Sequence, residues 1–258
     1  MISLILIFIF LSNSGYENLE KVFNYQKEMF KIKKDKEELE KLIKIAIQIK
    51  RYEIIDSLYE NVEENLKEIL FFYKIFVLYK IRKDPFLALE ILNKIPEKEE
   101  TQYTRGIKYL LAEIYKILGK LNEAENILED IINEKDTISF KGILLLYDIY
   151  KIKGEIKKME ELCAKTSFRW EDEKKGHILF RLAETKELKG EIEEAKKIYL
   201  LSAEYLFTSY DSLSLSFYRA GSLSDSKEEK IKLFEKAKEI ARNPLLKEKI
   251  EKDLIDLK

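Results

Sequence analysis

The sequence predicts an all-α chain, built as a solenoid of about six helix-turn-helix repeats with a capping helix at each end. The chain has 258 residues but only 8 Gly and 3 Pro, too few for an all-β protein with many tight turns. Heavy use of Ile, Leu, Lys and Glu favours helix. A pattern of two apolar helical stripes also recurs at a spacing of roughly 35 residues, which is typical of a helical array.

The stretch 104–136 shows the repeating unit most clearly. Its first apolar stripe recurs at three- and four-residue spacing and comprises Leu111, Ala112, Ile114, Tyr115 and Leu118. Gly119 follows directly, where a helix C-terminus favours a residue that tolerates a left-handed backbone. The second stripe comprises Leu121, Ala124, Ile127, Leu128 and Ile131. Two such helices leave apolar surface uncovered, so the hairpin needs neighbours.

The position of Gly119, named the turn position below, recurs six times along the chain, at Lys50, Lys83, Gly119, Gly154, Gly190 and Asp225. Successive differences are 33, 36, 35, 36 and 35 residues. Eight residues earlier, every repeat has an apolar residue: Leu42, Ile75, Leu111, Leu146, Leu182 and Phe217. Nine residues later the same holds for Tyr59, Leu92, Leu128, Cys163, Tyr199 and Phe234. Such columns predict one continuous array of hairpins without a second domain.

The pattern resembles the tetratricopeptide repeat, whose consensus runs W-x2-L-G-x2-Y and then A-x3-F. Leu111, Ala112 and Tyr115 match the first block, and Ala124 and Leu128 match the second. The consensus Trp is replaced by Lys108, and the late consensus Pro is mostly missing. The resemblance covers residues 36–244. It implies a right-handed α-solenoid in which the first helix of each hairpin lines the concave side.

The chain ends differ from the repeats. Residues 2–11 form an uncharged apolar run, too short for a bilayer about 30 Å thick, followed by small residues that include Ser12 and Ser14. We therefore expect residues 1–15 to be a signal peptide. A hydrophobic helix packed on the first repeat and an uncleaved membrane anchor are the alternatives. Residues 16–35 are predicted as an N-terminal capping helix, 36–244 as repeats and 245–258 as a C-terminal capping helix.

Two kinds of column on the first helices are candidate binding surfaces. Ten residues before the turn position, the apolar column includes Tyr73, Tyr109, Leu144 and Phe180. This column is interpreted either as a peptide-binding stripe with aromatic anchors or as packing between repeats. An acidic ladder of Glu113, Asp148 and Glu184 runs beside a basic ladder of Lys80, Lys116 and Lys151. These ladders form either i,i+3 surface ion pairs or a polar groove wall that reads an extended chain.

Several functional classes are disfavoured. With 47 Lys+Arg against 48 Asp+Glu, the net charge of −1 argues against a nucleic-acid binder. The single cysteine, Cys163, and single histidine, His177, leave no zinc spacing, and no phosphate-binding loop or nucleophile elbow is present. Cys163 is expected to be a small buried hydrophobe, and Trp170 to fill a junction between repeats. No catalytic, cofactor or metal site is predicted.

The sequence therefore predicts a non-enzymatic scaffold, exported to the periplasm or cell envelope, that binds a protein or peptide segment on its concave face. The alternative is a structural subunit that docks into an envelope complex through its convex face or its ends. A membrane contact is expected only if the N-terminal segment is retained. Tetratricopeptide domains that clamp cytosolic chaperone tails use Lys and Asn in these columns, whereas Tyr73 and Tyr109 occupy the usual Lys position here. Chaperone-tail recognition is therefore not expected.

Overall fold

The structure, a computed structural model, describes residues 13–92 and 101–257. Over these ranges every regular element is helical and no strand is present. The chain divides into two compact units, Met1–Lys120 and Leu121–Lys258, which are described separately. The boundary falls in the turn of the third hairpin. All-α architecture is thus confirmed.

Unit 1 consists of a single helix followed by two hairpins and the first helix of a third. Each helix packs against the next along the chain, and the first helices of the hairpins, α2, α4 and α6, also contact one another. The elements are α1 (Asn13–Lys33), α2 (Lys36–Gln48), α3 (Glu53–Tyr59), α4 (Glu64–Phe76), the π-helical turn η1 (Val77–Ile81), α5 (Pro85–Leu92) and α6 (Gln102–Ile117).

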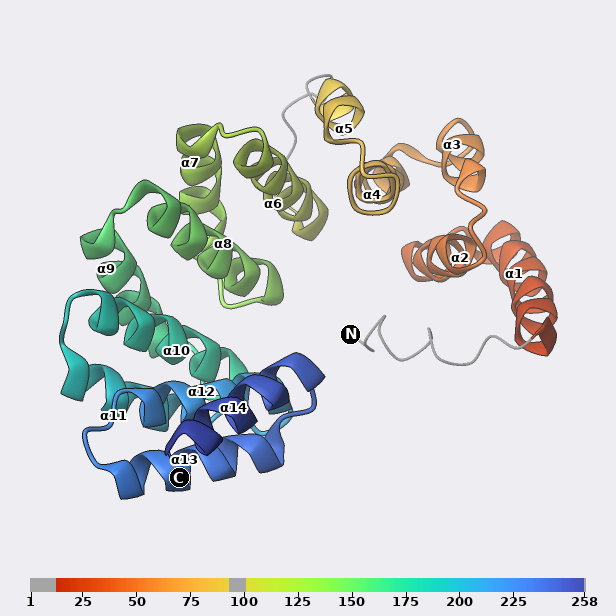
Figure 1. Cartoon of the computed structure of the whole chain (residues 1–258). Helices are drawn as coiled ribbons and strands as arrows, with labels where there is room; N and C mark the ends of the chain where they lie inside the picture. The colour runs from red at the N-terminus through yellow and green to blue at the C-terminus, as the bar shows by residue number, and fades with distance from the viewer. Residues whose placement is uncertain (1–12, 93–100, 258) are drawn as a thin grey trace. The chain divides into compact units, whose positions relative to one another are not determined.

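Unit 2 continues the same alternation to the C-terminal helix, which packs on α13 and α12 (Figure 1). Its first helices are α8, α10 and α12. The elements are α7 (Leu121–Ile131), α8 (Thr137–Lys153), α9 (Ile156–Ser167), α10 (Glu173–Leu188), α11 (Ile192–Ala203), α12 (Tyr210–Ser222), α13 (Lys227–Ile240) and α14 (Pro244–Leu257).

The turn position has the backbone that its sequence pattern predicts. Left-handed φ values occur at Lys50 (61°), Lys83 (59°), Gly119 (74°), Gly154 (72°) and Gly190 (78°). Asp225 is the exception, because α12 ends without a left-handed residue there. After Gly119 and Gly154, the next backbone N–H donates to the carbonyl five residues back, which satisfies a helix-end acceptor. The spacing pattern therefore marks real helix ends.

The core follows the predicted columns. Ala88, Ala124 and Ala195, five residues after the turn position, are 0% exposed. The small side chains of Ala88 and Ala195 let the two helices of their hairpins approach closely. Nine residues after the turn position, five of the six side chains are buried. The sixth, Tyr59, is 38% exposed because α3 has only 7 residues and ends there.

Acidic side chains at the start of some first helices hold the loop that precedes the next first helix. Glu173 of α10 accepts hydrogen bonds from the backbone N–H groups of Thr208 (2.5 Å) and Ser209 (2.9 Å). Asp211 of α12 accepts from the N–H groups of Arg242 and Asn243, both at 2.8 Å. These contacts satisfy loop amides across 31–36 residues of sequence and fix one hairpin against the next.

The second hairpin contains one extra residue in its first helix. The N–H of Asp84 donates to the carbonyl of Leu78, six residues back, whereas the equivalent bonds after Gly119 and Gly154 span five residues. The π-helical turn η1 absorbs the additional residue. Residues before η1 are consequently shifted by one place relative to the other hairpins.

Helices are present at both ends of the described chain, close to where the capping helices were predicted. Helix α1 begins at Asn13, three residues before the predicted start of the N-terminal capping helix, and α14 covers nearly all of the predicted C-terminal one. The first twelve residues of the expected signal peptide lie outside the described residues. Among the helices that are described, none combines the length and apolar character needed to cross a bilayer.

Candidate partner-binding surface

The apolar column of the first helices is half-buried in both units. In unit 1, the Tyr73 ring packs edge-on against Phe72 with centroids 5.2 Å apart, and burial raises the pKa of Tyr73. Tyr109 packs on a core cluster and donates its hydroxyl to Glu113 at 3.1 Å. In unit 2, the Phe180 ring lies 5.1 Å from the buried Tyr199 ring, and Leu144 is also half-buried. Each residue therefore combines core packing with an accessible edge.

The extra residue in α4 changes the alignment of this column. Ile75 is fully buried, like Ala112, Tyr147 and Ala183, yet it stands eight residues before its turn position whereas the others stand seven before theirs. Counting back through the π turn, Phe72 occupies the place that corresponds to Tyr109. Tyr73 lies one position further round the helix. A count at fixed spacing could not detect this shift.

The polar columns of unit 1 meet between consecutive first helices. Lys80 Nζ lies 2.6 Å from Glu113 Oε2 and 4.6 Å above the Tyr79 ring. Burial, assisted by the Glu113 charge, raises the pKa of Tyr79 to about 12. Lys116 is half-buried on α6. The ion pair thus joins α6 to the end of the preceding first helix.

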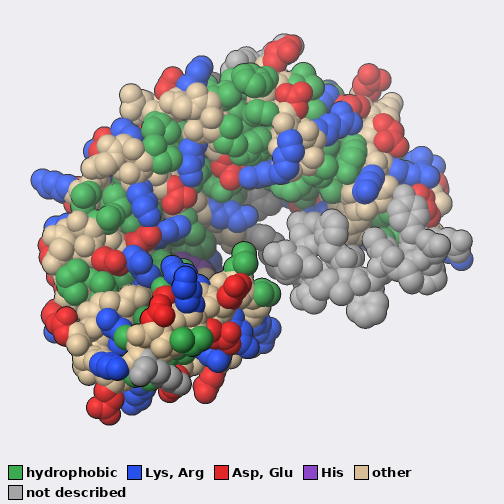
Figure 2. Space-filling view, viewed as in Figure 1, with side chains coloured by type: hydrophobic (Ala, Val, Ile, Leu, Met, Phe, Trp, Pro, Cys, Tyr) green, Lys and Arg blue, Asp and Glu red, His purple; other side chains and the backbone are tan. Residues whose placement is uncertain are grey.

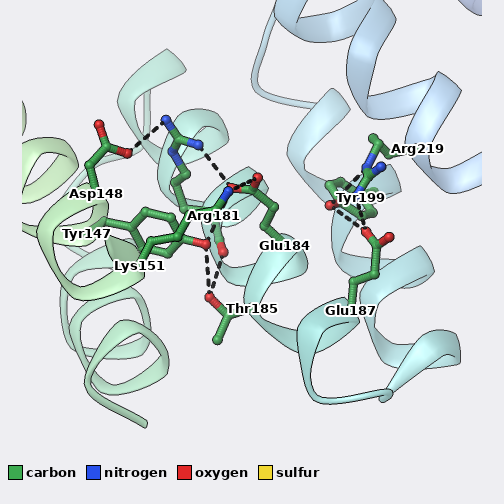
Figure 3. A network of polar contacts seen from close by, with 9 residues as sticks. All are labelled: Tyr147, Asp148, Lys151, Arg181, Glu184, Thr185, Glu187, Tyr199 and Arg219. Atoms are coloured by element: carbon green, nitrogen blue, oxygen red, sulfur yellow. Dashed lines mark hydrogen bonds and ion pairs between the residues drawn. The ribbon is translucent and has the colours of Figure 1, made fainter. Parts of the chain in front are cut away.

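Unit 2 contains a larger network with the same register, drawn in Figure 3. Lys151 Nζ of α8 lies 2.8 Å from Glu184 Oε1 of α10, and Arg181 lies 2.9 Å from Glu184 and 3.5 Å from Asp148. The buried Tyr147 hydroxyl contacts Glu184 at 3.3 Å and lies under the Arg181 guanidinium. Four charges from two first helices therefore share one half-buried cluster.

The electrostatics of this cluster favour its charged forms. Burial by itself raises the pKa of Glu184, but hydrogen bonds from Lys151 and Arg181 outweigh it and hold that pKa below its ordinary value. Burial likewise acts to lower the pKa of Arg181, and the Glu184 contact reverses this. The Glu184 carboxylate and the Arg181 guanidinium are thus both charged at neutral pH.

A second pair extends the pattern to α12. Arg219 lies 2.7 Å from Glu187, one turn along α10 from the first cluster, and the buried Tyr199 donates its hydroxyl to the same carboxylate at 3.0 Å (Figure 3). Burial raises the pKa of Tyr199. The first helices α8, α10 and α12 are therefore joined in sequence by ion pairs.

Ion pairs between hairpins were not part of the i,i+3 arrangement expected along one helix. Glu113 pairs with Lys80, and Lys151 pairs with Glu184, each 33 residues apart. The sequence contained a usable signal, because a Lys three residues before one turn position is followed by an acid six residues before the next. Stacked first helices bring those two positions together. All ten candidate residues therefore lie on first helices. Four of them, Lys80, Glu113, Lys151 and Glu184, form ion pairs with a residue of a neighbouring hairpin.

The other singled-out residues are structural. Trp170 is 3% exposed and its ring packs edge-on against Phe140, which confirms the predicted junction role. Cys163 is 1% exposed, as predicted, and burial raises the pKa of its thiol to about 12. His177 lines a shallow hollow of about 360 Å³ with Phe140 and Phe207, and burial lowers its pKa. No metal-holding cluster of His, Cys, Asp and Glu occurs among the described residues.

The visible surface around these helices mixes basic, acidic and apolar side chains (Figure 2). This distribution agrees with the balanced formal charge of −1. On the face that is drawn, charges of neither sign predominate, so that face offers no single-sign field for steering a strongly charged ligand.

No protein-family model matches the chain, and no curated protein matches it significantly. Solved structures do. Tetratricopeptide-like repeats of a putative kinesin light chain from Podosopora anserina superpose with a TM-score of 0.52 and 16% identity, covering 66% of this chain and 92% of that one. YrrB, described as a tetratricopeptide protein with an unusual peptide-binding site, superposes with a TM-score of 0.51 and 15% sequence identity. This match covers 78% of this chain and 99% of YrrB. BtubC from P. vanneervenii superposes with a TM-score of 0.53 and 13% sequence identity, and the match covers 88% of this chain and 90% of BtubC.

These likenesses agree with the helical hairpins, the left-handed turn positions and the small residues at the helix crossings. The chain therefore has the tetratricopeptide-repeat-like α-solenoid fold.

Proposed function

We propose that the chain is a non-enzymatic protein-interaction scaffold that binds a partner segment along the exposed faces of its first helices. The observation that supports this most directly is the repetition of one polar and apolar pattern on consecutive first helices. Lys151, Glu184 and Phe180 keep accessible edges on adjoining helices of unit 2. YrrB, which shares the fold, is described as having a peptide-binding site, and that supports a peptide or protein partner here.

We further propose that the scaffold acts in the cell envelope. The support is the uncharged apolar run at residues 2–11 and the small residues that follow it. Sequencing the N-terminus of the protein isolated from producing cells tests this. A mature chain that begins near residue 15 or 16 supports export with cleavage, and a chain that begins at Met1 contradicts it.

Site-specific photo-crosslinking tests the binding surface. A benzophenone side chain in place of Lys151, 44% exposed on α8, is expected to capture a partner segment that mass spectrometry identifies. Lys157, 90% exposed on α9, is the matched control on a second helix. Crosslinks of equal yield from position 157, or none from position 151, would contradict binding along the first helices.

A second candidate function is that of an assembly subunit which docks through its ends. The specific observation is that both terminal helices expose large apolar side chains: Tyr25 (65%) and Ile32 (76%) on α1, and Leu245 (77%) and Ile255 (73%) on α14. Crosslinks from position 255 or 32 to one partner, with none from position 151, would favour this function.

A further inference from the structure

One carboxylate on α10 holds the loop between α11 and α12. Glu173 accepts hydrogen bonds from the N–H groups of Thr208 and Ser209 at 2.5 and 2.9 Å, and from the Thr208 hydroxyl at 2.5 Å. Because Ser209 directly precedes α12, these bonds fix the start of one hairpin on the first helix of the hairpin before it. The three hydrogen bonds are named the Glu173 clamp below.

The single histidine of the chain lies one helical turn from this clamp. His177 follows Glu173 by four residues on α10, and its Nε2 atom lies 3.5 Å from the Ser209 Oγ atom. The ring is half-buried in the shallow hollow that Phe140 and Phe207 also line. The imidazole is therefore close both to the carboxylate of the clamp and to the loop that the clamp holds.

The surroundings of His177 disfavour a positive charge on its ring. Burial lowers the pKa of His177, and the Arg181 guanidinium, one turn further along α10, lowers it as well. The Glu173 carboxylate raises this pKa but does not outweigh the other two effects. The folded chain therefore favours the neutral imidazole.

The neighbouring elements present mainly uncharged side chains to the ring. From α8 the packed neighbour is Phe140, whose ring centroid lies 6.1 Å away, and the adjacent Lys141 is exposed. From the loop before α12 the neighbours are Phe207 and Ser209. These residues offer no negative charge that could balance an imidazolium.

The other charged residues near the hollow have partners of their own. Asp172 and Lys174, which line it, bind each other at 2.8 Å. Asp211, near the start of α12, accepts hydrogen bonds from the next interhairpin loop. Glu173 is thus the carboxylate that acts in favour of a protonated His177.

A protonated ring would compete with the loop for that carboxylate. An imidazolium has two N–H donors and gains most from a charged acceptor. The Glu173 oxygens already accept hydrogen bonds from Thr208 and Ser209. If the carboxylate turns towards the imidazolium, it gives up bonds to the loop, whose N–H groups then become available to water.

We propose that His177 is a pH-sensitive switch, whose protonation releases the 207–209 loop from α10 and loosens the junction between the α10–α11 and α12–α13 hairpins. The switch is independent of the proposed partner binding.

The sequence confines this switch to mildly acidic solution. His177 is the only histidine, and the ordinary pKa values of Asp and Glu lie near 4, so His177 is the side chain expected to change charge between about pH 5 and 7. Because its folded-state pKa is lowered, the stability that the neutral ring provides is fully present above about pH 6.5. That stability is lost as the pH falls through the folded-state pKa.

Hydrogen–deuterium exchange of the purified full chain at pH 7.5 and pH 5.0 tests the switch, with each rate divided by the intrinsic amide rate at that pH. Normalised exchange of the segment 207–211 is expected to rise at least fivefold at pH 5.0. The segment 242–246 is the matched control, because Asp211 holds the N–H groups of Arg242 and Asn243 at 2.8 Å and is followed one turn later by Leu215. Its exchange is expected to change less than twofold.

Two variants and one titration complete the test. His177→Gln, which is neutral at both pH values, should abolish the increase in acid, and Glu173→Ala should give fast exchange of the loop at both pH values. The wild-type imidazole, followed by NMR, should titrate below about pH 6.5. Unchanged exchange of the loop, an equal increase in His177→Gln or in the segment 242–246, or a ring that titrates at or above pH 6.5 would each overturn the proposal.

Discussion

Lys151 on α8 and Glu184 on α10 form an ion pair of 2.8 Å across 33 residues of sequence. Lys80 and Glu113 repeat this relationship in the other unit, at 2.6 Å and the same separation. In both pairs the carboxylate is the less exposed partner, with 18% and 16% of its side chain accessible. A charged position of one hairpin therefore has its counterpart in the next hairpin, and the ladders join repeats as well as facing solvent.

A double-mutant cycle should measure this joining. For Lys151→Met and Glu184→Gln, we expect a coupling free energy of about 0.5–1 kcal/mol from urea unfolding, because the pair is partly shielded from water. The i,i+4 pair Lys157–Glu161 is the control, since its charges are 3.9 Å apart and its side chains are 90% and 65% exposed. Its coupling should be near zero. Equal couplings for the two pairs would contradict a structural role for the ladder.

Acid should weaken unit 1 through Glu38. Its side chain is 6% exposed, and hydrogen bonds from Lys33 and then Gln26 lower its pKa to about 2. Because this folded-state pKa lies below the ordinary value of 4.5, the stabilisation is fully present above about pH 4.5 and is lost as the pH falls towards 2. The urea midpoint should therefore decrease across that window, and Glu38→Gln should flatten the decrease. Glu28→Gln, at an exposed ion pair, should keep the wild-type slope.

The turn positions should respond to substitution with opposite signs. Gly154→Ala is expected to destabilise by about 1 kcal/mol, because the left-handed backbone is unfavourable for alanine. An added Cβ at Gly154 meets no heavy atom within 4 Å, so crowding does not contribute. Lys83→Gly is expected to stabilise by roughly 0.5–1 kcal/mol, because it relieves the same backbone at φ 59°. Chemical unfolding of both variants checks this, and a shared sign would contradict it.

The spacing of residues was sufficient to predict features that depend on a single repeat, such as helix ends and core positions. Five of the six marked turn positions are left-handed in the structure, and Ala124 and Leu128, placed in the core from their own repeat, are buried. Gly221 stands four residues before its turn position, the place that Tyr115 occupies in the third hairpin. In the structure, a Cβ there would lie 2.8 Å from the Phe234 ring, so the glycine makes room for the second helix of its hairpin. That explanation requires knowing which side chain lies opposite.

The partners of the candidate site residues could not be predicted from one hairpin. Glu113 and Lys151 find their counterions on neighbouring repeats, and an i,i+3 pattern within a single helix does not contain that contact. The displacement of Tyr73 from the place of Tyr109 has a different cause. It comes from a backbone hydrogen bond that spans an additional residue, and the side-chain pattern around Val77–Ile81 stays apolar in either register.

Removing the extra residue of the second hairpin should be tolerated. Deleting Phe76 places Ile75 seven residues before Lys83, the separation of the buried Ala112 and Tyr147 from their own turn positions. The π turn can then close as ordinary α-helix, so we expect unfolding to remain cooperative with a change below about 1 kcal/mol.

Deleting Arg181 from the regular helix α10 is the matched control. There, loss of one residue rotates the preceding part of the helix by about 100° relative to its partners, and Ile178 and Leu179 leave the core. That variant should lose several kcal/mol or fail to fold, because each buried aliphatic side chain contributes about 2–5 kcal/mol. Circular dichroism and urea unfolding compare the two deletions. If the deletion of Phe76 is as damaging as that of Arg181, the π turn is required by its own packing and is not an inserted residue that the repeat can lose.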